Sequence, residues 1–207
     1  MHVTIPKLHV VTPPGVDERE HATTETLLRA GAPLVQVRTK AVDDRARLRR
    51  ASVVLSAARA VGAACLVNDR VDIALAAGAD GVHVGADDLP VAAVRRLVGP
   101  DAIVGATCRN VEDARRAEAD GASYLGVGPV FATSTKTGLP EPMGPRGVEA
   151  VAAAVGVPVI AISGITVDNA AVVLEAGAWG VAVVAAVYGA DDPVASLRAL
   201  MEVTGCG

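Results

Sequence analysis

The stretch GADGVHV, residues 78–84, closes an alanine-rich helical segment and opens a short apolar run. A glycine at the end of a helix is a common stop signal, and an apolar run of this length is typical of a buried strand. The arrangement recurs as GAPLVQV from Gly31, DGASYLGVG from Asp120 and GAWGVAVV from Gly177. Strands that alternate with helices predict a parallel sheet with right-handed crossovers.

Extended along the chain, this pattern predicts strands at Leu8–Val11, Leu34–Val37, Ala64–Val67, Gly81–Val84, Ile103–Gly105, Tyr124–Gly128, Val159–Ile162 and Gly180–Val184. The clearest helices are expected at Asp43–Val61, Val148–Val155 and Val194–Glu202. Eight strand–helix units with no linker between them predict a single (β/α)₈ barrel over residues 1–207. A doubly wound open sheet is the alternative, but no GxGxxG fingerprint follows an early strand.

The composition narrows the function classes. Apolar residues make up 51% of the 207 residues but aromatics only 2%, so the core is expected to consist of Val, Ala, Leu and Ile. So few aromatic rings argue against a single-stranded nucleic-acid binder, which stacks bases on them. A net charge of −4 gives no general attraction to nucleic acid or to an anionic membrane. We expect neither as a partner, and any basic site must be local.

Targeting signals are weak. The three cysteines are widely spaced, without metal-binding or disulfide spacing, which favours buried thiols in a reducing compartment. The N-terminal MHVTIPKLHVV lacks the features of a signal peptide. The uncharged run Ala150–Val167 contains Gly156, Pro158 and Gly164, which argues against a membrane span. A cytoplasmic enzyme is expected.

Polar residues gather at the predicted strand ends. In (β/α)₈ barrels the active site lies at this carboxyl-terminal face. The second strand leads into Gln36, Arg38 and Lys40, whose period-two spacing puts them on one side if the strand stays extended. The other strand ends contribute Asn68 with Asp69, Asp87 with Asp88, Thr107, Thr133–Lys136, Ser163 with Gly164, and Val184 with Ala185.

Each of these residues also has a purely structural interpretation. Asp69 is suited to cap the helix expected at Val71–Ala77, and taken alone this role is favoured over a catalytic one. Asp87 or Asp88 suits the cap of the helix that follows Pro90. Thr107 suits the cap of a helix that begins near Val111. For His83, inside an apolar strand, a satisfied core histidine is favoured over a ligand.

Together the residues indicate a more specific chemistry. Asp69 and Asp88 leave adjacent strands at one face, and two desolvated carboxylates there require a cation. Mg²⁺ suits them, because it takes one or two carboxylates plus phosphate oxygens and water. Arg38, Lys40 and Lys136 would surround a polyphosphate. The hydroxyls of GVGPVFATSTK, residues 126–136, and the loop at Gly164 suit a second phosphate. The pattern predicts a metal-bound pyrophosphate beside a monophosphate.

Five motifs in this order resemble the thiamine-phosphate synthase family: QVRTK at 36–40, VNDRVDIAL at 67–75, GADGVHVGADDL at 78–89, GVGPVFATSTK at 126–136 and ISGI at 162–165. The resemblance implies a (β/α)₈ barrel that joins a hydroxymethylpyrimidine diphosphate to a hydroxyethylthiazole phosphate and releases pyrophosphate. It also implies a transferase assisted by Mg²⁺, with small-molecule substrates. Helix faces rich in Ala and Val are compatible with a homo-oligomer.

The resemblance also assigns roles to residues. It implies that Asp69 and Asp88 hold Mg²⁺ and that Arg38, Lys40 and Lys136 stabilise the leaving group. The residues implied to bind the pyrimidine diphosphate are Gln36, Val37, Arg38, Thr39, Lys40, Asn68, Thr107 and Lys136. Those implied to bind the thiazole phosphate are Thr133, Ser134, Thr135, Gly164, Val184 and Ala185. The chain departs from the family pattern at Ala86, Thr107, Ser163 and Ala185.

Two other functions stay open at the level of sequence. The related thiazole tautomerase shares the fold and the last two phosphate loops, but its histidine after the fifth strand is absent from Ala106–Arg109. A non-catalytic binder of the thiazole phosphate would not need both aspartates. The joint presence of Arg38, Lys40, Asp69 and Asp88 favours the synthase.

Overall fold

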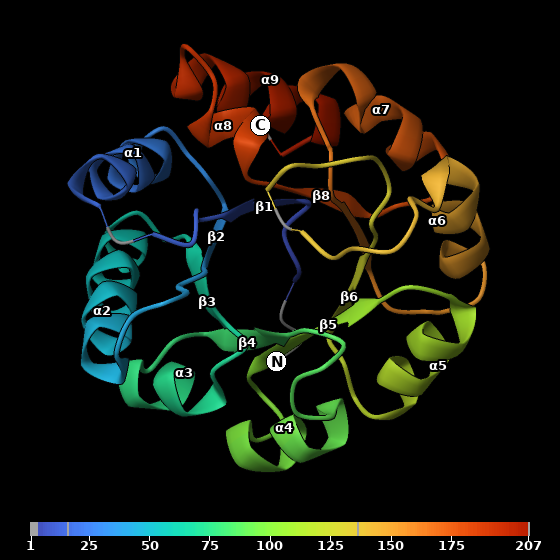
Figure 1. Cartoon of the computed structure of the whole chain (residues 1–207), viewed down its shortest axis with the longest axis horizontal. Coiled ribbons are helices and arrows are strands. Elements are labelled where there is room, and N and C mark those ends of the chain that lie inside the picture. Colours follow the sequence, from blue (N-terminus) through green and yellow to red (C-terminus); the bar gives the residue numbers. More distant parts are fainter. Residues whose placement is uncertain (1–3, 16, 136, 207) are drawn as a thin grey trace.

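The computed structural model describes residues 4–15, 17–135 and 137–206 of the chain. Its strands are all parallel and form one closed barrel in sequence order, in which β8 returns to pair with β1. Figure 1 looks along the barrel and shows the strands as an inner ring inside an outer ring of helices. The predicted (β/α)₈ barrel is therefore confirmed, and the open doubly wound sheet is wrong.

The strands are short and mostly coincide with the apolar runs of the sequence. β5 continues past the predicted end at Gly105, because Thr107 and Cys108 pair with Gly126 and Val127 of β6. The strands are β1 Leu8–Val11, β2 Leu34–Val37, β3 Ala64–Asn68, β4 Gly81–Val84, β5 Ile103–Cys108, β6 Tyr124–Val127, β7 Val159–Ile162 and β8 Gly180–Val183.

The helices agree with the predicted positions except around the sixth one. The helix expected at Val148–Val155 begins earlier, at Gly144, because Pro145 occupies its first turn, and it ends at Ala152. The helices are α1 Glu18–Arg29, α2 Asp44–Ala60, α3 Val71–Ala77, α4 Val91–Val98, α5 Val111–Ala119, α6 Gly144–Ala152, α7 Val167–Glu175, α8 Ala185–Tyr188 and α9 Pro193–Thr204.

Two apolar layers stabilise the barrel. The larger lies between the strands and the surrounding helices and consists mainly of valine and alanine, as the composition predicts. The smaller fills the barrel interior with alternate strand residues, among them Leu34, Leu66, Ile103, Tyr124 and Ile160. The barrel interior is therefore a packed core and not a pore.

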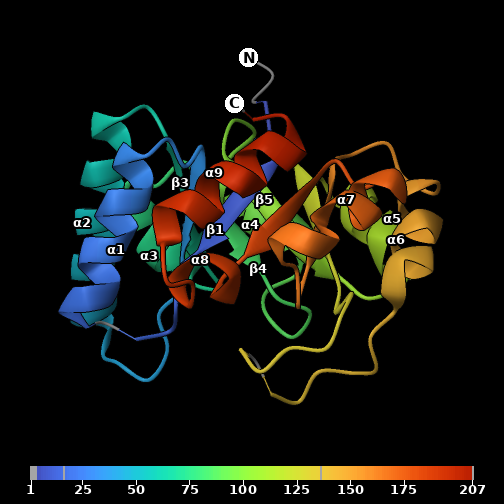
Figure 2. The same ribbon diagram turned by 90° about the horizontal axis from the view of Figure 1, so that it is seen from above.

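The two ends of the barrel differ. In Figure 2 the described ends of the chain lie at the upper end, whereas the long connection from β6 to α6 extends from the lower end. The lower end is therefore the carboxyl-terminal face of the strands, where the predicted site residues gather. None of the described helices combines the length and apolarity needed to cross a membrane.

Candidate active site

A cavity of about 440 Å³ opens at the carboxyl-terminal face of the strands. This volume lies in the range of small-molecule sites. The cavity collects most of the residues predicted from the strand ends, namely Gln36, Arg38, Lys40, Asn68, Asp69, Thr107, Thr133, Ser134, Thr135, Gly164, Val184 and Ala185. Strand ends from all around the barrel thus meet in one place.

The segment after β2 carries the positive charge. Thr12 holds the Arg38 backbone from both sides, since its Oγ1 donates to the Arg38 carbonyl at 3.1 Å and accepts from the Arg38 amide at 2.9 Å. The Lys40 amide donates to the Pro14 carbonyl at 3.0 Å. Nη1 of Arg38 is buried and has no hydrogen-bond partner among the described residues. A buried, unpaired guanidinium donor beside a cavity suits an anionic ligand.

Val37 and Thr39 were also expected to bind substrate, and the structure does not bring them to the cavity. Val37 packs with Val54 and Leu55 of α2 on the outside of the barrel. The Thr39 carbonyl accepts from Nη1 of Arg47 at 2.5 Å. The alternation of the strand decides this, because it directs Gln36, Arg38 and Lys40 inward and their neighbours outward.

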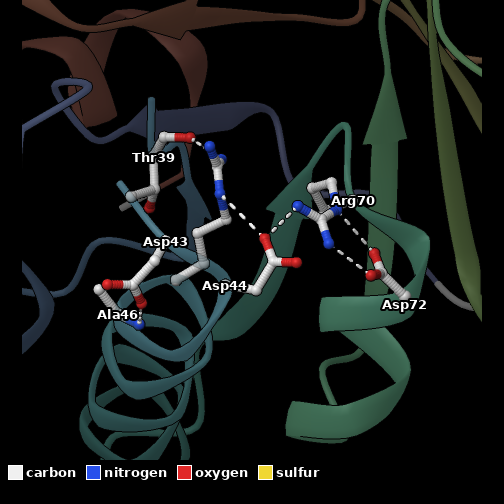
Figure 3. A network of polar contacts seen from close by, with 7 residues as sticks. Thr39, Asp43, Asp44, Ala46, Arg70 and Asp72 are labelled. Carbon is white, nitrogen blue, oxygen red and sulfur yellow. Dashed lines mark hydrogen bonds and ion pairs between the residues drawn. The ribbon is translucent and has the colours of Figure 1, made fainter. Parts of the chain in front are cut away.

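Figure 3 shows the polar network that supports this segment from outside. The Asp43 carboxylate caps α2 by accepting from the Ala46 amide at 2.8 Å. The Arg70 guanidinium bridges α2 and α3, since it donates to Asp44 at 2.6 Å and to Asp72 at 2.9 Å. Arg70 directly follows Asp69. The network therefore ties the segment that carries Lys40 to the one that carries Asp69.

The aspartates of β3 and β4 do not cap helices, contrary to the structural interpretation. Asp69 has a φ of 65°, and its carboxylate accepts from Nζ of Lys40 instead of from the start of α3. Asp88 accepts from the Gly85 amide at 2.7 Å, and α4 has no side-chain cap. A non-glycine residue in the left-handed region is strained, and such strain gathers at functional sites.

The two carboxyl groups lie side by side and differ in acidity. Burial raises the pKa of Asp69, but hydrogen bonds with Lys40 and Asp88 outweigh burial and leave the pKa lowered. Burial and the neighbouring Asp69 raise the pKa of Asp88. The pair thus holds one negative charge easily and a second only with more positive charge nearby.

This donor set fits Mg²⁺. Asp69 and Arg38 line the cavity; Asp88 does not, but it is hydrogen-bonded to Asp69, and this adjacent pair matches a metal bound jointly by protein and phosphate. The described residues contain no group of three or more His, Cys, Asp or Glu side chains that could enclose a metal. The remaining ligands would therefore come from substrate and water.

Thr107 was given a helix cap as its alternative role, and this is wrong. Asn110 caps α5 instead, by accepting from the Asp113 amide at 2.8 Å. Oγ1 of Thr107 lies 3.0 Å from Nε2 of His83, and both residues line the cavity. His83 is satisfied within the barrel, as expected, but it also reaches the cavity, which the apolar sequence around it does not reveal.

The loops after β6 and β7 pack closely together. The Phe131 amide donates to the Ser163 carbonyl at 3.0 Å. A Cβ on Gly164 would lie 2.5 Å from the Ala132 carbonyl oxygen, so only glycine fits there. This contact places Thr133–Thr135 beside Gly164 and beside the turn at Val184 and Ala185. Hydroxyl donors and the backbone at the start of α7 and α8 therefore share one edge of the cavity.

Comparisons with known proteins identify the family of the chain. A family model described as thiamine monophosphate synthase matches residues 8–187. The chain belongs to this family. The named members of this family are thiamine-phosphate synthases, so the chain is assigned to the transferases, as the sequence motifs predict.

Individual relatives give the same result. A thiamine-phosphate synthase of Chloroflexus aurantiacus is 46% identical over 208 residues, covering 98% of this chain and 96% of that protein. A thiamine biosynthesis bifunctional protein of Symbiobacterium thermophilum is 49% identical, and the match covers 92% of this chain but only 38% of that protein. Among solved structures, thiamine phosphate pyrophosphorylase from Pyrococcus furiosus has a TM-score of 0.86 and 36% identity, covering 96% of this chain and 95% of that chain.

Some residues that line the cavity were not predicted from the sequence, and one predicted residue lies outside the described part of the chain. Val11, His83, Ala132, Ile165, Thr166 and Ala186 also line the cavity. Most are small or apolar, so only their positions next to strand ends could have indicated them. Lys136 lies outside the described residues, and its role stays a prediction.

Proposed function

We propose that this synthase joins a hydroxymethylpyrimidine diphosphate to a hydroxyethylthiazole phosphate in the cavity at the strand ends. One observation carries the proposal, namely that the cavity has two different anion-binding edges. Arg38, Lys40 and Asp69 line the cavity from the ends of β2 and β3, with Asp88 hydrogen-bonded to Asp69, whereas Thr133–Thr135 and Gly164 line it from the loops after β6 and β7, across the barrel. A diphosphate needs metal and cations, whereas a monophosphate needs only neutral donors.

Asp69 and Asp88 would hold Mg²⁺, which when bound supplies positive charge to the diphosphate oxygens. Arg38 and Lys40, with Lys136, would donate to the same oxygens. Gln36, Asn68 and Thr107 would orient the pyrimidine from the cavity floor. Gly164, Val184 and Ala185, with the hydroxyls of Thr133–Thr135, would hold the thiazole phosphate.

In this assignment the chain acts by placing charge and aligning the substrates. The CH₂–O bond breaks with its electron pair on pyrophosphate, and Arg38 and Lys40 stabilise the developing negative charge. The thiazole nitrogen, kept close by its phosphate, then forms the C–N bond with the pyrimidine CH₂ carbon. No protein nucleophile is required.

The test is an assay of the purified protein with both precursors, with and without Mg²⁺, that measures pyrophosphate and thiamine phosphate. We expect equal amounts of both products, and only with Mg²⁺. Metal-independent coupling would exclude the role of the aspartates. Isomerisation of the thiazole phosphate without coupling would instead indicate a tautomerase.

Replacing Asp69 tests the metal edge. Asp69→Asn keeps the shape of the side chain and the tolerance of a positive φ, so the protein should stay folded. Loss of the carboxylate should lower kcat/KM about 100-fold or more. The matched control is Asp101→Asn, which removes an exposed carboxylate just before β5 and should leave the kinetics unchanged. A normally active Asp69→Asn protein would contradict the assignment.

A further inference from the structure

A line of polar side chains runs through the barrel interior to the cavity floor. The hydroxyl of Tyr124 lies 2.8 Å from Nδ1 of His83, and Nε2 of His83 lies 3.0 Å from Oγ1 of Thr107. Tyr124 is 1% exposed and does not line the cavity, whereas His83 and Thr107 do. The line therefore links a fully buried hydroxyl with one that can meet a ligand.

Glycines in the neighbouring strands make room for this line. A Cβ on Gly105 of β5 would lie 2.2 Å from Cζ of Tyr124 and 2.5 Å from Nδ1 of His83. A Cβ on Gly126 of β6 would lie 2.8 Å from Cε1 of His83. All three distances are too short for any side chain at Gly105 or Gly126, so the interior is kept open for these rings. On the far side of Tyr124 the His9 ring packs edge-on, with 4.8 Å between the ring centroids.

The hydrogen-bond chemistry gives the line a direction. Burial raises the pKa of Tyr124, so its hydroxyl keeps its proton. Among the described residues, His83 Nδ1 is the hydrogen-bond partner of that hydroxyl. A buried hydroxyl that gives its proton to no acceptor is costly, so Nδ1 must accept. With Nδ1 accepting, the ring proton lies on Nε2, which donates it to Thr107 Oγ1. The Thr107 hydroxyl proton is left to point away from His83.

We infer that Tyr124 is a positioning residue that acts through His83 to hold the Thr107 hydroxyl as a donor toward the cavity. Its target is an acceptor atom of the bound pyrimidine diphosphate, either a ring nitrogen or a phosphate oxygen, and in this respect the inference rests on the proposed function. Tyr124 touches neither substrate. It determines whether the Thr107 hydroxyl donates a hydrogen bond to the ligand or accepts one from it.

The tautomer of His83 can be observed directly in the wild-type protein. ¹⁵N-edited NMR of the histidine rings at neutral pH, without substrate, should show His83 Nε2 protonated and Nδ1 unprotonated. The Tyr124→Phe variant should lose this preference and show a mixture of tautomers. A wild-type His83 protonated on Nδ1 would overturn the inference, whatever the activity of the enzyme.

Kinetics of a double-mutant cycle test the consequence. Tyr124→Phe should lower kcat/KM for the pyrimidine diphosphate about tenfold and leave KM for the thiazole phosphate unchanged. Thr107→Val should cause a loss at least as large, and Thr107→Ser should restore most of it. If Tyr124 acts through Thr107, then Tyr124→Phe has no further effect in the Thr107→Val background. Additive losses would contradict the inference.

The second tyrosine of the chain provides the matched control. The Tyr188 hydroxyl is partly buried and lies 2.8 Å from Oγ1 of Thr24, outside the cavity. Tyr188→Phe removes an equivalent hydrogen bond, so it should lower Tm as Tyr124→Phe does but leave the kinetics unchanged. If both variants lost kcat/KM equally, Tyr124 would have only a structural role and the inference would be wrong. Failure of the wild-type protein to couple the precursors would instead reject the proposed function and leave the NMR result standing.

Discussion

At the scale of the residue, His9 shows how strongly the barrel interior changes a side chain. It is fully buried, and its Nε2 lies 3.0 Å from the Pro6 carbonyl oxygen. Burial, reinforced by the nearby His83, lowers its pKa from 6.5 to about 3. The histidine is therefore neutral in the fold at any pH at which the enzyme works, and it acts as a polar core residue.

This shift predicts a loss of stability in mild acid. Because the folded pKa lies below the unfolded one, the unfolded chain binds a proton first as the pH falls from 6.5 toward 3. The contribution of neutral, buried His9 to the free energy of unfolding is complete above pH 6.5 and should fall by about 2 kcal/mol between pH 6.5 and 5. Urea unfolding at several pH values measures it. The control is His9→Gln, which keeps a donor for the Pro6 carbonyl but cannot titrate, so it should lose distinctly less stability between pH 6.5 and 5. Identical pH profiles for the two proteins would contradict the lowered pKa of His9.

At the scale of the element, a glycine at a strand start decides how closely two strands approach. A Cβ on Gly180, the first residue of β8, would lie 2.0 Å from the Lys7 carbonyl oxygen just before β1. Gly81 stands in the same relation to Ile103 at the start of β5. In the segments GADG (78–81) and GAWG (177–180), the first glycine ends a helix and the second begins a strand. The second glycine is needed because a side chain there would meet the backbone of the neighbouring strand.

Substituting Gly180 should be costly for this reason. Gly180→Ala should lower the free energy of unfolding by about 3 kcal/mol, because the β1 backbone must move. Gly62→Ala is the control, since a Cβ there meets nothing within 4 Å and the φ of 74° alone causes strain. That variant should lose about 1 kcal/mol. Chemical unfolding compares the two, and equal losses would show that backbone approach does not matter.

At the scale of the whole molecule, closure of the barrel joins the two ends of the sequence. Leu8 pairs with Val181 and Val10 with Val183, so β1 and β8 form a seam. The last helix, α9, packs against α1, α7, α8 and β1 across this seam. Leu197 and Leu200 of α9 are fully buried there. The chain therefore has to be synthesised to its last helix before the seam is covered.

Truncating a seam residue should weaken the molecule without altering the site. Leu200→Ala should lower the free energy of unfolding by about 2–5 kcal/mol, because it leaves a cavity in the core. Leu97→Ala on α4, where the leucine is 57% exposed, is the control and should cost less than about 0.5 kcal/mol. Both folded proteins should have unchanged kinetic constants. A change in KM for Leu200→Ala alone would show that the seam influences the cavity.

The sequence pattern alone predicts the architecture and places several residues at the cavity. Apolar runs alternating with alanine-rich helices leave few ways to bury the apolar faces, and parallel strand ends must meet at one face. Gln36, Arg38, Asn68 and Thr107 could therefore be placed at the cavity from their positions alone.

The contacts of the polar side chains depend on the three-dimensional fold and could not be predicted from local sequence. Asp69 accepts from Lys40, a residue 29 positions away, although local rules favoured a helix cap. Likewise Thr107 meets His83, which meets Tyr124, across three strands. The physical reason is that helix periodicity and caps are local, whereas these partners are set by the register of neighbouring strands and by the backbone angle at one residue.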